Sequence, residues 1–342
     1  CECWELTYSQ GTRCVCKNVE FEVTDEAGKL SLLNDFEVRY SYYGDEIETA
    51  YTDYPSYEEA NAFLLDKFRN LRDLSLWLET TDVDKATNEL FETPKVYAGQ
   101  TFTNDTAECR LAKFKTEFDS HFDKEYTFVY FIITELLLAY DSRGKNVMLS
   151  TYGPKTPGGP YIWYPIFYDI DTQLGINNSG IPTWEYDVDA TLTGQFSTSN
   201  SVLWTNIYTC YLEEIKAKYQ ALRGQLLNYN NLNGYYNCNP DVSKSYAMMG
   251  ARPIMMVNID EYYKYIAPTF DSYIDTSGNM VKDTGYYFYC LQGTRQLQRE
   301  LFLRNRFNYI DSQWQAGSYS NASINVKLRY DANDAINTSD KF

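Results

Sequence analysis

The sequence predicts an α+β protein in which a strand-rich N-terminal portion is followed by a mainly helical portion with a central hairpin. Residues 1–50 alternate apolar and polar positions in short runs separated by turn residues, a pattern typical of strands. From Ser56 onward, apolar residues recur three and four positions apart, which is the period of a helix. We therefore expect a strand-rich portion over residues 1–50, a mainly helical portion over residues 51–315, and a tail or connecting segment over residues 316–342.

The clearest strands of the N-terminal portion are residues 19–23 and 36–40, where apolar and polar side chains alternate. The chain opens at Cys1 in sequence that already has the character of a strand. We therefore expect it to continue a longer polypeptide, which would make the strand-rich portion a truncated one.

Four of the eight cysteines form two Cys-x-Cys pairs near the start of the chain. If residues 1–16 fold back on themselves about Ser9, the alternation of a strand places four thiols on one face of a sheet, those of Cys1, Cys3, Cys14 and Cys16. Such a face can bind zinc or form disulfides, but metal sites more often have two residues between paired cysteines. We expect reduced, buried thiols, with a metal site as the alternative.

Helical patterns occupy most of the remaining chain. Ser56 and Glu59 form a capping box that begins a long amphipathic helix with apolar positions as far as Leu78. A polar stretch rich in Thr and Asn follows over residues 80–106, and helical spacing resumes over residues 111–122. Further helices are expected over residues 202–227 and 292–314.

A second helix and a hairpin form the centre of the predicted fold. Residues 124–140 are apolar around most of the circumference of a helix, which is typical of a buried central helix. Apolar runs at residues 147–149 and 161–168 flank a turn rich in Gly and Pro over residues 153–160. This arrangement predicts a β-hairpin.

Composition limits the function classes. The net charge is -17, with 30 basic against 47 acidic residues, which disfavours nucleic acid as the main partner and disfavours anionic membrane surfaces. The most apolar stretch, residues 126–140, is shorter than the roughly 20 residues of a transmembrane helix, so we expect no membrane association. With His121 as the only histidine, a Ser-His-Asp triad and a histidine-rich metal centre are excluded in practice.

Acidic and amide side chains flank the predicted hairpin. Asp141 follows the buried helix, and Asn146 lies five residues later. Asp169 and Asp171 form an Asp-x-Asp pair directly after the second strand. A hairpin centred near Pro157 places Asn146 opposite Asp169 with Cβ atoms about 5 Å apart, close enough to share a metal ion.

These residue types point to phosphoryl transfer. Asparagine and carboxylate oxygens suit Mg²⁺ or Mn²⁺, which bridge nucleotide phosphates in such reactions. The spacing of Asp141 and Asn146 also matches the Asp-x4-Asn of the protein-kinase catalytic loop, whose Asp positions the attacking hydroxyl. The alternative is that these two residues cap the buried helix and shape a tight turn.

The same unit resembles CotH-type kinase domains. The resemblance rests on the apolar helix, on Asp141 and Asn146, on the strand pair and on the aromatic and acidic segment 164–175, Tyr-Pro-Ile-Phe-Tyr-Asp-Ile-Asp-Thr-Gln-Leu-Gly. The chain is still more similar to the CotH-like domains of virion proteins from crAss-like and related tailed phages. That similarity continues through residues 177–180, 184–189 and 299–307 and covers about two thirds of the chain.

The resemblance implies a protein-kinase-like fold and a role for each candidate residue. Asp141 matches the catalytic-loop Asp, Asn146 the metal-binding Asn, and Asp169 or Asp171 the main metal carboxylate. Lys17, on an early strand, is the candidate for contacting the phosphates of ATP. If the domain is catalytic, it is an ATP-dependent phosphotransferase that uses Mg²⁺ or Mn²⁺.

The resemblance also implies a location and partners. We expect a virion protein of the phage tail or muzzle, assembled in the bacterial host cytoplasm with other tail proteins. The 33 tyrosines suit wide, partly hydrated interfaces, and we expect a homo-oligomer.

Two other functions stay open. One is a purely structural assembly module without catalysis, and the other is a metal-dependent glycosyltransferase that uses an Asp-x-Asp motif. A second such motif, Asp187 and Asp189, either adds metal ligands or is a solvated strand edge. We expect the arginines of the last helix to form a solvated or ion-paired face: Arg299, Arg304 and Arg306.

Overall fold

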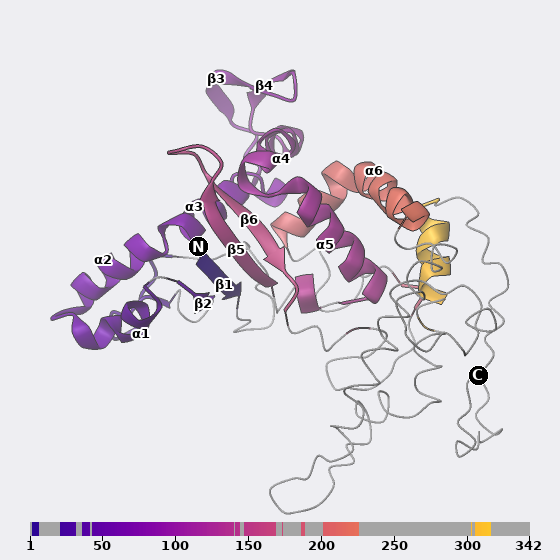
Figure 1. The fold of residues 1–342 in the computed structure, drawn as a ribbon. Helices are drawn as coiled ribbons and strands as arrows, with labels where there is room; N and C mark the ends of the chain where they lie inside the picture. Colours follow the sequence, from indigo (N-terminus) through magenta and orange to yellow (C-terminus); the bar gives the residue numbers. More distant parts are fainter. Residues whose placement is uncertain are drawn as a thin grey trace, which may run out of the picture. The chain divides into compact units, whose positions relative to one another are not determined.

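The chain has a mixed α+β fold, as predicted (Figure 1). The computed structural model describes residues 2–6, 21–31, 36–41, 43–139, 141–143, 147–168, 173, 186–188, 201–225, 302 and 305–315. The chain divides into two compact units. The first comprises Cys1–Glu135, Ala139–Ile170 and Asp189–Leu212, and the second Leu136–Leu138, Asp171–Val188 and Glu213–Phe342. The predicted boundaries at residues 50 and 315 stay predictions.

The first unit contains a four-stranded antiparallel sheet with the strand order β2-β1-β5-β6. Its strands are β1 (Glu2–Leu6), β2 (Phe36–Tyr40), β5 (Val147–Pro154) and β6 (Tyr161–Ile166). β1 pairs with β2 along one edge and with β5 along the other. The fold-back of residues 1–16 about Ser9, considered for the four cysteines, does not occur at β1, because β2 and β5 occupy both of its edges.

The sequence predicted some N-terminal elements and missed another. β2 covers the predicted residues 36–40. Within the predicted strand 19–23, the described residues Phe21–Val23 form no strand, and the chain there folds into a turn closed by a bridge between Thr24 and Leu30. Helix α1 (Gly44–Asp53) was not predicted; it begins within the portion expected to be strand-rich and buries Ile47 and Ala50.

The predicted long helix after Ser56 is two helices, α2 (Tyr57–Lys67) and α3 (Arg69–Glu79). The Ser56 hydroxyl accepts a hydrogen bond from the Glu59 backbone N–H, as the capping motif predicted. The two helices meet at Phe68, whose side chain is fully buried. The Phe68 ring lies 4.4 Å from the ring of Trp4 on β1, so the break falls where the helix packs on the sheet.

The predicted helices around the sheet are present. Helix α4 (Ala107–His121) begins at Thr106, and helix α5 (Lys124–Leu137) begins at the predicted residue. α5 lies beside β6 in Figure 1, and the rings of Tyr126 and Tyr164 meet there at 5.7 Å. α5 is buried on most sides, as its apolar circumference predicted. Within the described part of the chain, no helix is both long and apolar enough to cross a bilayer.

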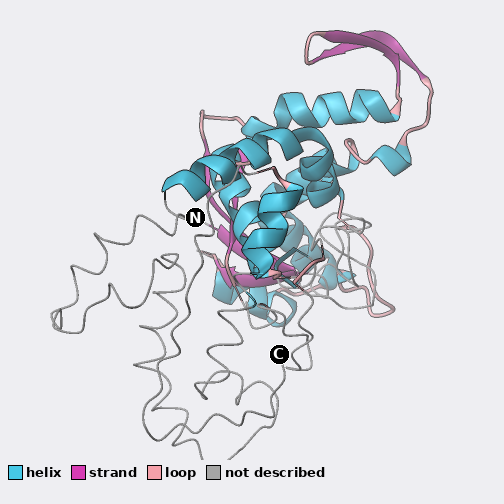
Figure 2. Ribbon diagram, turned by 90° about the vertical axis from the view of Figure 1, so that its right-hand side faces the viewer, coloured by secondary structure: helices cyan, strands magenta, loops and turns pink. Residues whose placement is uncertain are grey.

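An unpredicted hairpin lies between α3 and α4. After the short 3-10 helix η2 (Val83–Lys85), strands β3 (Leu90–Tyr97) and β4 (Gln100–Asn104) form a separate two-stranded sheet. Figures 1 and 2 show this hairpin standing out from α4. We call residues 87–105 the arm. The composition of residues 80–106 is polar, and most side chains of both strands are exposed. The sequence therefore has no alternation of apolar and polar residues there that would have predicted the strands.

Helix α6 (Val202–Gln225) matches the predicted helix and belongs to both units. In the first unit, the Asn206 amide donates a hydrogen bond to the Thr81 carbonyl at 3.0 Å. In the second unit, the fully buried Arg223 donates to the Asp311 carboxylate at 2.6 and 2.9 Å, and the Tyr219 hydroxyl donates to the same carboxylate. Residues 305–313 are helical, within the predicted last helix.

Candidate functional site

The structure describes the backbone of one predicted site residue. Asp141 begins the 3-10 helix η3 (Asp141–Arg143), which directly follows the turn after α5. Lys17, Asn146, Asp169 and Asp171 lie outside the described residues. The helix, the Asp and the hairpin therefore occur in the predicted order, and the predicted metal site stays a prediction.

The hairpin next to η3 is present as predicted, in a slightly different register. β5 pairs with β6 so that Met148 lies opposite Ile166 and Leu149 opposite Pro165. A register in which Asn146 lies opposite Asp169 would pair Leu149 with Ile166, so the predicted register is wrong by one residue over these strands. An irregularity between Thr151 and Pro154 accounts for the shift, because it adds a residue near the turn.

Arg143 attaches η3 to α5. Its side chain is 2 % exposed, and so is that of its ion-pair partner Glu135, whose carboxylate lies 2.8 Å from Nη1. Nε donates to the Thr134 hydroxyl at 2.9 Å, and Nη2 donates to the Phe131 carbonyl at 2.6 Å. The guanidinium also lies over the Phe131 ring, 3.9 Å from its centroid. One side chain thus makes four kinds of contact with the last two turns of α5.

Ser142 provides a second attachment of η3. The Tyr130 hydroxyl on α5 donates to the Ser142 carbonyl at 2.6 Å. Burial raises the pKa of Tyr130 far above its ordinary value, so this hydroxyl stays a protonated donor. The Tyr130 ring stacks on Trp204 of α6 at 5.6 Å. The backbone of residues 142 and 143 is therefore held against buried structure.

The turn into η3 contains an uncommon backbone conformation. Leu138 has a φ of 55°, in the left-handed region that usually requires glycine. The Ala139 N–H donates to the Thr134 carbonyl at 2.9 Å, which is the bond that closes a helix end of the Schellman type. The end of α5 and the contacts of η3 together fix the position of the Asp141 backbone.

Sequence reasoning missed Arg143 and Glu135, although a signal for them was present. Glu135 interrupts the apolar helix, and an acid buried in such a helix requires a partner or solvent. The nearest following basic residue in the chain is Arg143. A buried carboxylate next to a short polar loop therefore could have indicated this ion pair.

Of the second Asp-x-Asp motif, the structure describes one acid. Asp187 is exposed, and Asp189 lies outside the described residues. Arg306 is fully buried and donates to the carbonyls of Tyr186, at 2.9 Å, and of Val188. The expectation of a solvated side chain is therefore wrong for Arg306, and the expectation of an ion pair stays a prediction. Arg299 and Arg304 lie outside the described residues.

A shallow cleft in the first unit lies beside His121. It has a volume of about 210 Å³ and is lined by Asn70, Asp73, Leu74, His121, Gly158, Gly159, Pro160, Tyr161 and Trp163. The imidazole stacks on Trp77 at 4.0 Å. Burial, with a smaller contribution from Lys113, lowers the pKa of His121 to about 4. The imidazole is therefore neutral at pH 7.

Cysteines in the described ranges show no sign of a metal centre. Cys3, Cys109 and Cys210 are reduced thiols. Cys109 is buried, whereas Cys3 and Cys210 are half-buried, so the expectation of a buried thiol is wrong at Cys3. Burial raises the pKa of Cys109 and of Cys210, that of Cys210 to about 11, so neither of these two is a thiolate at neutral pH. No three His, Cys, Asp or Glu side chains among the described residues gather closely enough to hold a metal ion. Cys1, Cys14 and Cys16 lie outside those ranges.

The fold and the attached η3 define an α+β protein with a rigid helix, turn and hairpin unit. Comparison of the chain with protein-family models, with curated proteins and with solved structures finds no match.

His121 should make the stability of the chain depend on pH. Its folded pKa of about 4 lies below the ordinary value of 6.5, so the unfolded state binds more protons between these values. The free energy of unfolding should therefore be highest above pH 6.5 and fall as the pH falls toward 4. His121→Phe, which keeps a ring on Trp77, should remove much of this dependence. Melting temperatures of the wild-type chain and of His121→Phe, measured from pH 4 to 7, test this difference. Parallel curves for the two chains would contradict the lowered pKa of His121.

Proposed function

We propose that this chain is a CotH kinase-like domain of a phage tail or muzzle-type virion protein. The observation that supports the proposal is the order of α5, η3 beginning at Asp141, and the antiparallel hairpin β5-β6. In this order the chain enters β5 and leaves β6 at the same end of the hairpin. β5 begins directly after Asn146, and β6 ends three residues before Asp169.

The attachment by Arg143 suits a site of this kind. Groups that position a reacting hydroxyl must be held by packed, hydrogen-bonded structure, because small displacements cost much of the rate. Arg143 and Tyr130 supply such a support for η3, and the proposed role of Asp141 is to orient the attacking hydroxyl. Lys17 is the proposed phosphate contact.

The proposed metal ligands are all oxygen donors. Asn146, Asp169 and Asp171 would hold Mg²⁺ or Mn²⁺, whose charge neutralises the phosphates of bound ATP. Hard cations of this type prefer such ligands, so the donor set fits the ion.

A structural assembly module is the second candidate. The exposed arm favours it, because a projecting hairpin with exposed apolar side chains serves contacts rather than chemistry. Leu90 is 82 % exposed and Val96 64 % exposed. The two candidates are compatible when a kinase-like domain has been built into a virion protein and has lost its activity.

Cation binding is the direct test of the proposed site. We expect Mg²⁺ or Mn²⁺ to raise the melting temperature, because a cation relieves the repulsion between Asp169 and Asp171 and binds only the folded state. Asp169→Ala should remove the shift, whereas the matched control Asp187→Ala, at an exposed acid of the second motif, should keep it. The measurement is differential scanning fluorimetry with and without ATP.

An unchanged wild-type melting temperature would overturn the metal site. Cation-dependent transfer from a labelled UDP-sugar, without transfer from labelled ATP, would replace the kinase-like proposal by the glycosyltransferase alternative.

The virion location has its own test. We expect peptides of this chain in purified particles of the phage that encodes it, at several copies per particle, because tail structures are symmetric assemblies. Quantitative mass spectrometry of gradient-purified particles measures this. Absence from the particles, with the protein recovered from the soluble lysate instead, would defeat the virion proposal and leave the cation test unaffected.

A further inference from the structure

The cleft beside His121 lies among three elements of the first unit: α3, the end of α4, and the turn between β5 and β6. α3 contributes an amide and a carboxylate, those of Asn70 and Asp73, and the turn contributes Gly158 and Gly159. The volume of about 210 Å³ lies below the roughly 300 to 1,000 Å³ of pockets for drug-sized ligands. The cleft therefore suits a single long side chain or a small molecule of that size.

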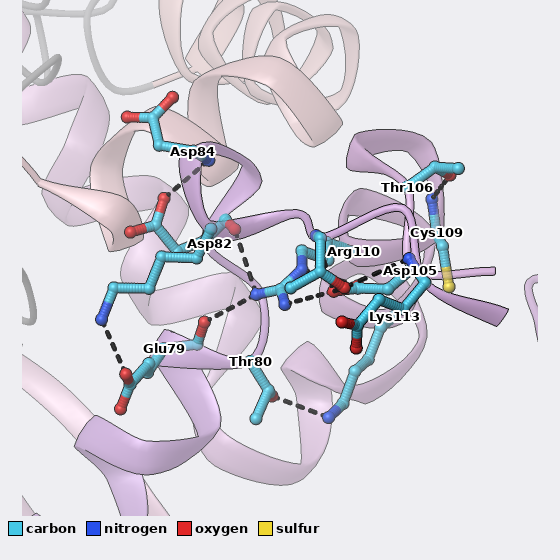
Figure 3. Close-up of polar contacts among 12 residues, drawn as sticks. Glu79, Thr80, Asp82, Asp84, Asp105, Thr106, Cys109, Arg110 and Lys113 are labelled. Carbon is cyan, nitrogen blue, oxygen red and sulfur yellow. Dashed lines mark hydrogen bonds and ion pairs between the residues drawn. The ribbon is translucent and has the colours of Figure 1, made fainter. Parts of the chain in front are cut away.

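The two helices that line the cleft are fixed to each other by polar contacts (Figure 3). Arg110 of α4 donates to the Glu79 carbonyl at the end of α3, at 3.1 Å. An ion pair with Asp105, at 2.5 Å, orients the Arg110 guanidinium. The Lys113 ammonium of α4 donates to the Thr80 hydroxyl, directly after α3, at 2.7 Å. These contacts hold α3 in a fixed position against α4.

The turn between β5 and β6 is attached to the end of α4. The Lys155 ammonium in the turn donates to the Asp119 carbonyl at 3.1 Å. On β6, the Trp163 carbonyl accepts a hydrogen bond from the Asp123 N–H at 3.3 Å, and Trp163 forms a bridge with Phe122. All three sides of the cleft are therefore fixed before a ligand binds, which lowers the entropic cost of binding.

Asp73 gives the cleft a negative charge that the chain does not compensate. The nearby bases of α3 are engaged elsewhere. Arg69 pairs with Asp66 at 3.6 Å, and Arg72 pairs with Glu22. Within the described part of the chain, the Asp73 carboxylate makes no hydrogen bond or ion pair. Asp73 is exposed, so a cation can reach this carboxylate from solvent.

The other side chains of the cleft are neutral, and several are aromatic. His121 is neutral at pH 7, so it does not compensate the charge of Asp73. Tyr161 and Trp163 of β6 also line the cleft. Aromatic rings attract cations, whereas Asp73 repels anions, and an apolar ligand would remove the carboxylate from water without a partner. The charge and the lining together favour a monovalent organic cation.

A guanidinium fits this lining better than an ammonium does. It is planar, donates two parallel N–H bonds to one carboxylate, and stacks on aromatic rings. An ammonium is a compact and strongly hydrated charge, so it loses more on leaving water for a lining of rings. Leu74 and Pro160 provide apolar contacts for an alkyl stem.

We propose that the cleft binds a guanidinium group on an alkyl stem, as in arginine, and that the Asp73 carboxylate accepts its hydrogen bonds. The group comes either from the side chain of a protein partner or from a free guanidinium compound, and the net charge of -17 attracts both. None of the lining residues belongs to the proposed kinase-like site. The cleft and the proposed function can therefore fail separately.

Titration with matched ligands tests the chemistry. N-acetyl-arginine amide and N-acetyl-citrulline amide differ in that a neutral urea replaces the guanidinium. Selective ¹⁵N-glycine labelling of the full chain makes the amide resonances of Gly158 and Gly159 reporters of the cleft. We expect saturable shifts at millimolar concentrations of the arginine compound and at least about tenfold weaker binding of the citrulline compound. Equal binding of the two, or no saturable shift with either, would overturn the proposal.

Substitution of the carboxylate tests the site. Asp73→Asn keeps the shape of the side chain and removes its charge, so it should weaken binding of the arginine compound at least about tenfold. The matched control is Asp119→Asn, which removes an exposed charge from the end of α4 outside the cleft and should leave binding unchanged. Circular dichroism verifies folding of both variants. An equal loss of affinity in the two would show attraction by the net charge alone and overturn the site.

A short peptide distinguishes the two sources of the guanidinium. If the source is a protein partner, the peptide Gly-Gly-Arg-Gly-Gly should bind as tightly as N-acetyl-arginine amide, since the cleft then admits a side chain from a continuous backbone. Much weaker binding of the peptide would exclude this source and assign the cleft to a free guanidinium compound.

Discussion

The guanidinium of Arg143 is the contact on which the arrangement of α5, η3 and the hairpin depends. It lies in an interior with almost no solvent, paired with Glu135 and bonded to a hydroxyl and a carbonyl of the same helix. An unpaired charge at this depth would cost several kcal/mol, so the pair is retained only while both partners stay in place. Because η3 is three residues long, fixing Ser142 and Arg143 also fixes the backbone from which Asp141 projects.

Sequence patterns predicted the elements whose formation depends on residues that are close together in the chain. The hydroxyl of Ser56 caps α2 as predicted, because a capping box depends on residues a few positions apart. The buried circumference of α5 and the β5-β6 hairpin followed in the same way from apolar periodicity and turn residues. Of the predicted site, Asp141 alone is described, at the start of η3, while Lys17, Asn146, Asp169 and Asp171 lie outside the described residues.

Features that depend on distant partners could not be predicted in this way. β1 lies between β2 and β5, which are far from it in the chain, and no local pattern identifies such neighbours. The break at Phe68 follows from its packing on Trp4, again a long-range contact. The arm was missed for a different reason. Its strands have exposed side chains on both faces, so apolar and polar residues do not alternate along them.

The most direct test of this account is a double-mutant cycle on the buried pair. Arg143→Met and Glu135→Leu each leave one charge buried without its partner, and each should lower the free energy of unfolding by about 3 to 5 kcal/mol. The double variant, which removes both charges, should lose at least about 2 kcal/mol less than the sum of the single losses. Urea denaturation of the four chains gives these values. Single losses below about 1 kcal/mol that simply add in the double variant would contradict the role of Arg143 as the contact that holds η3 to α5.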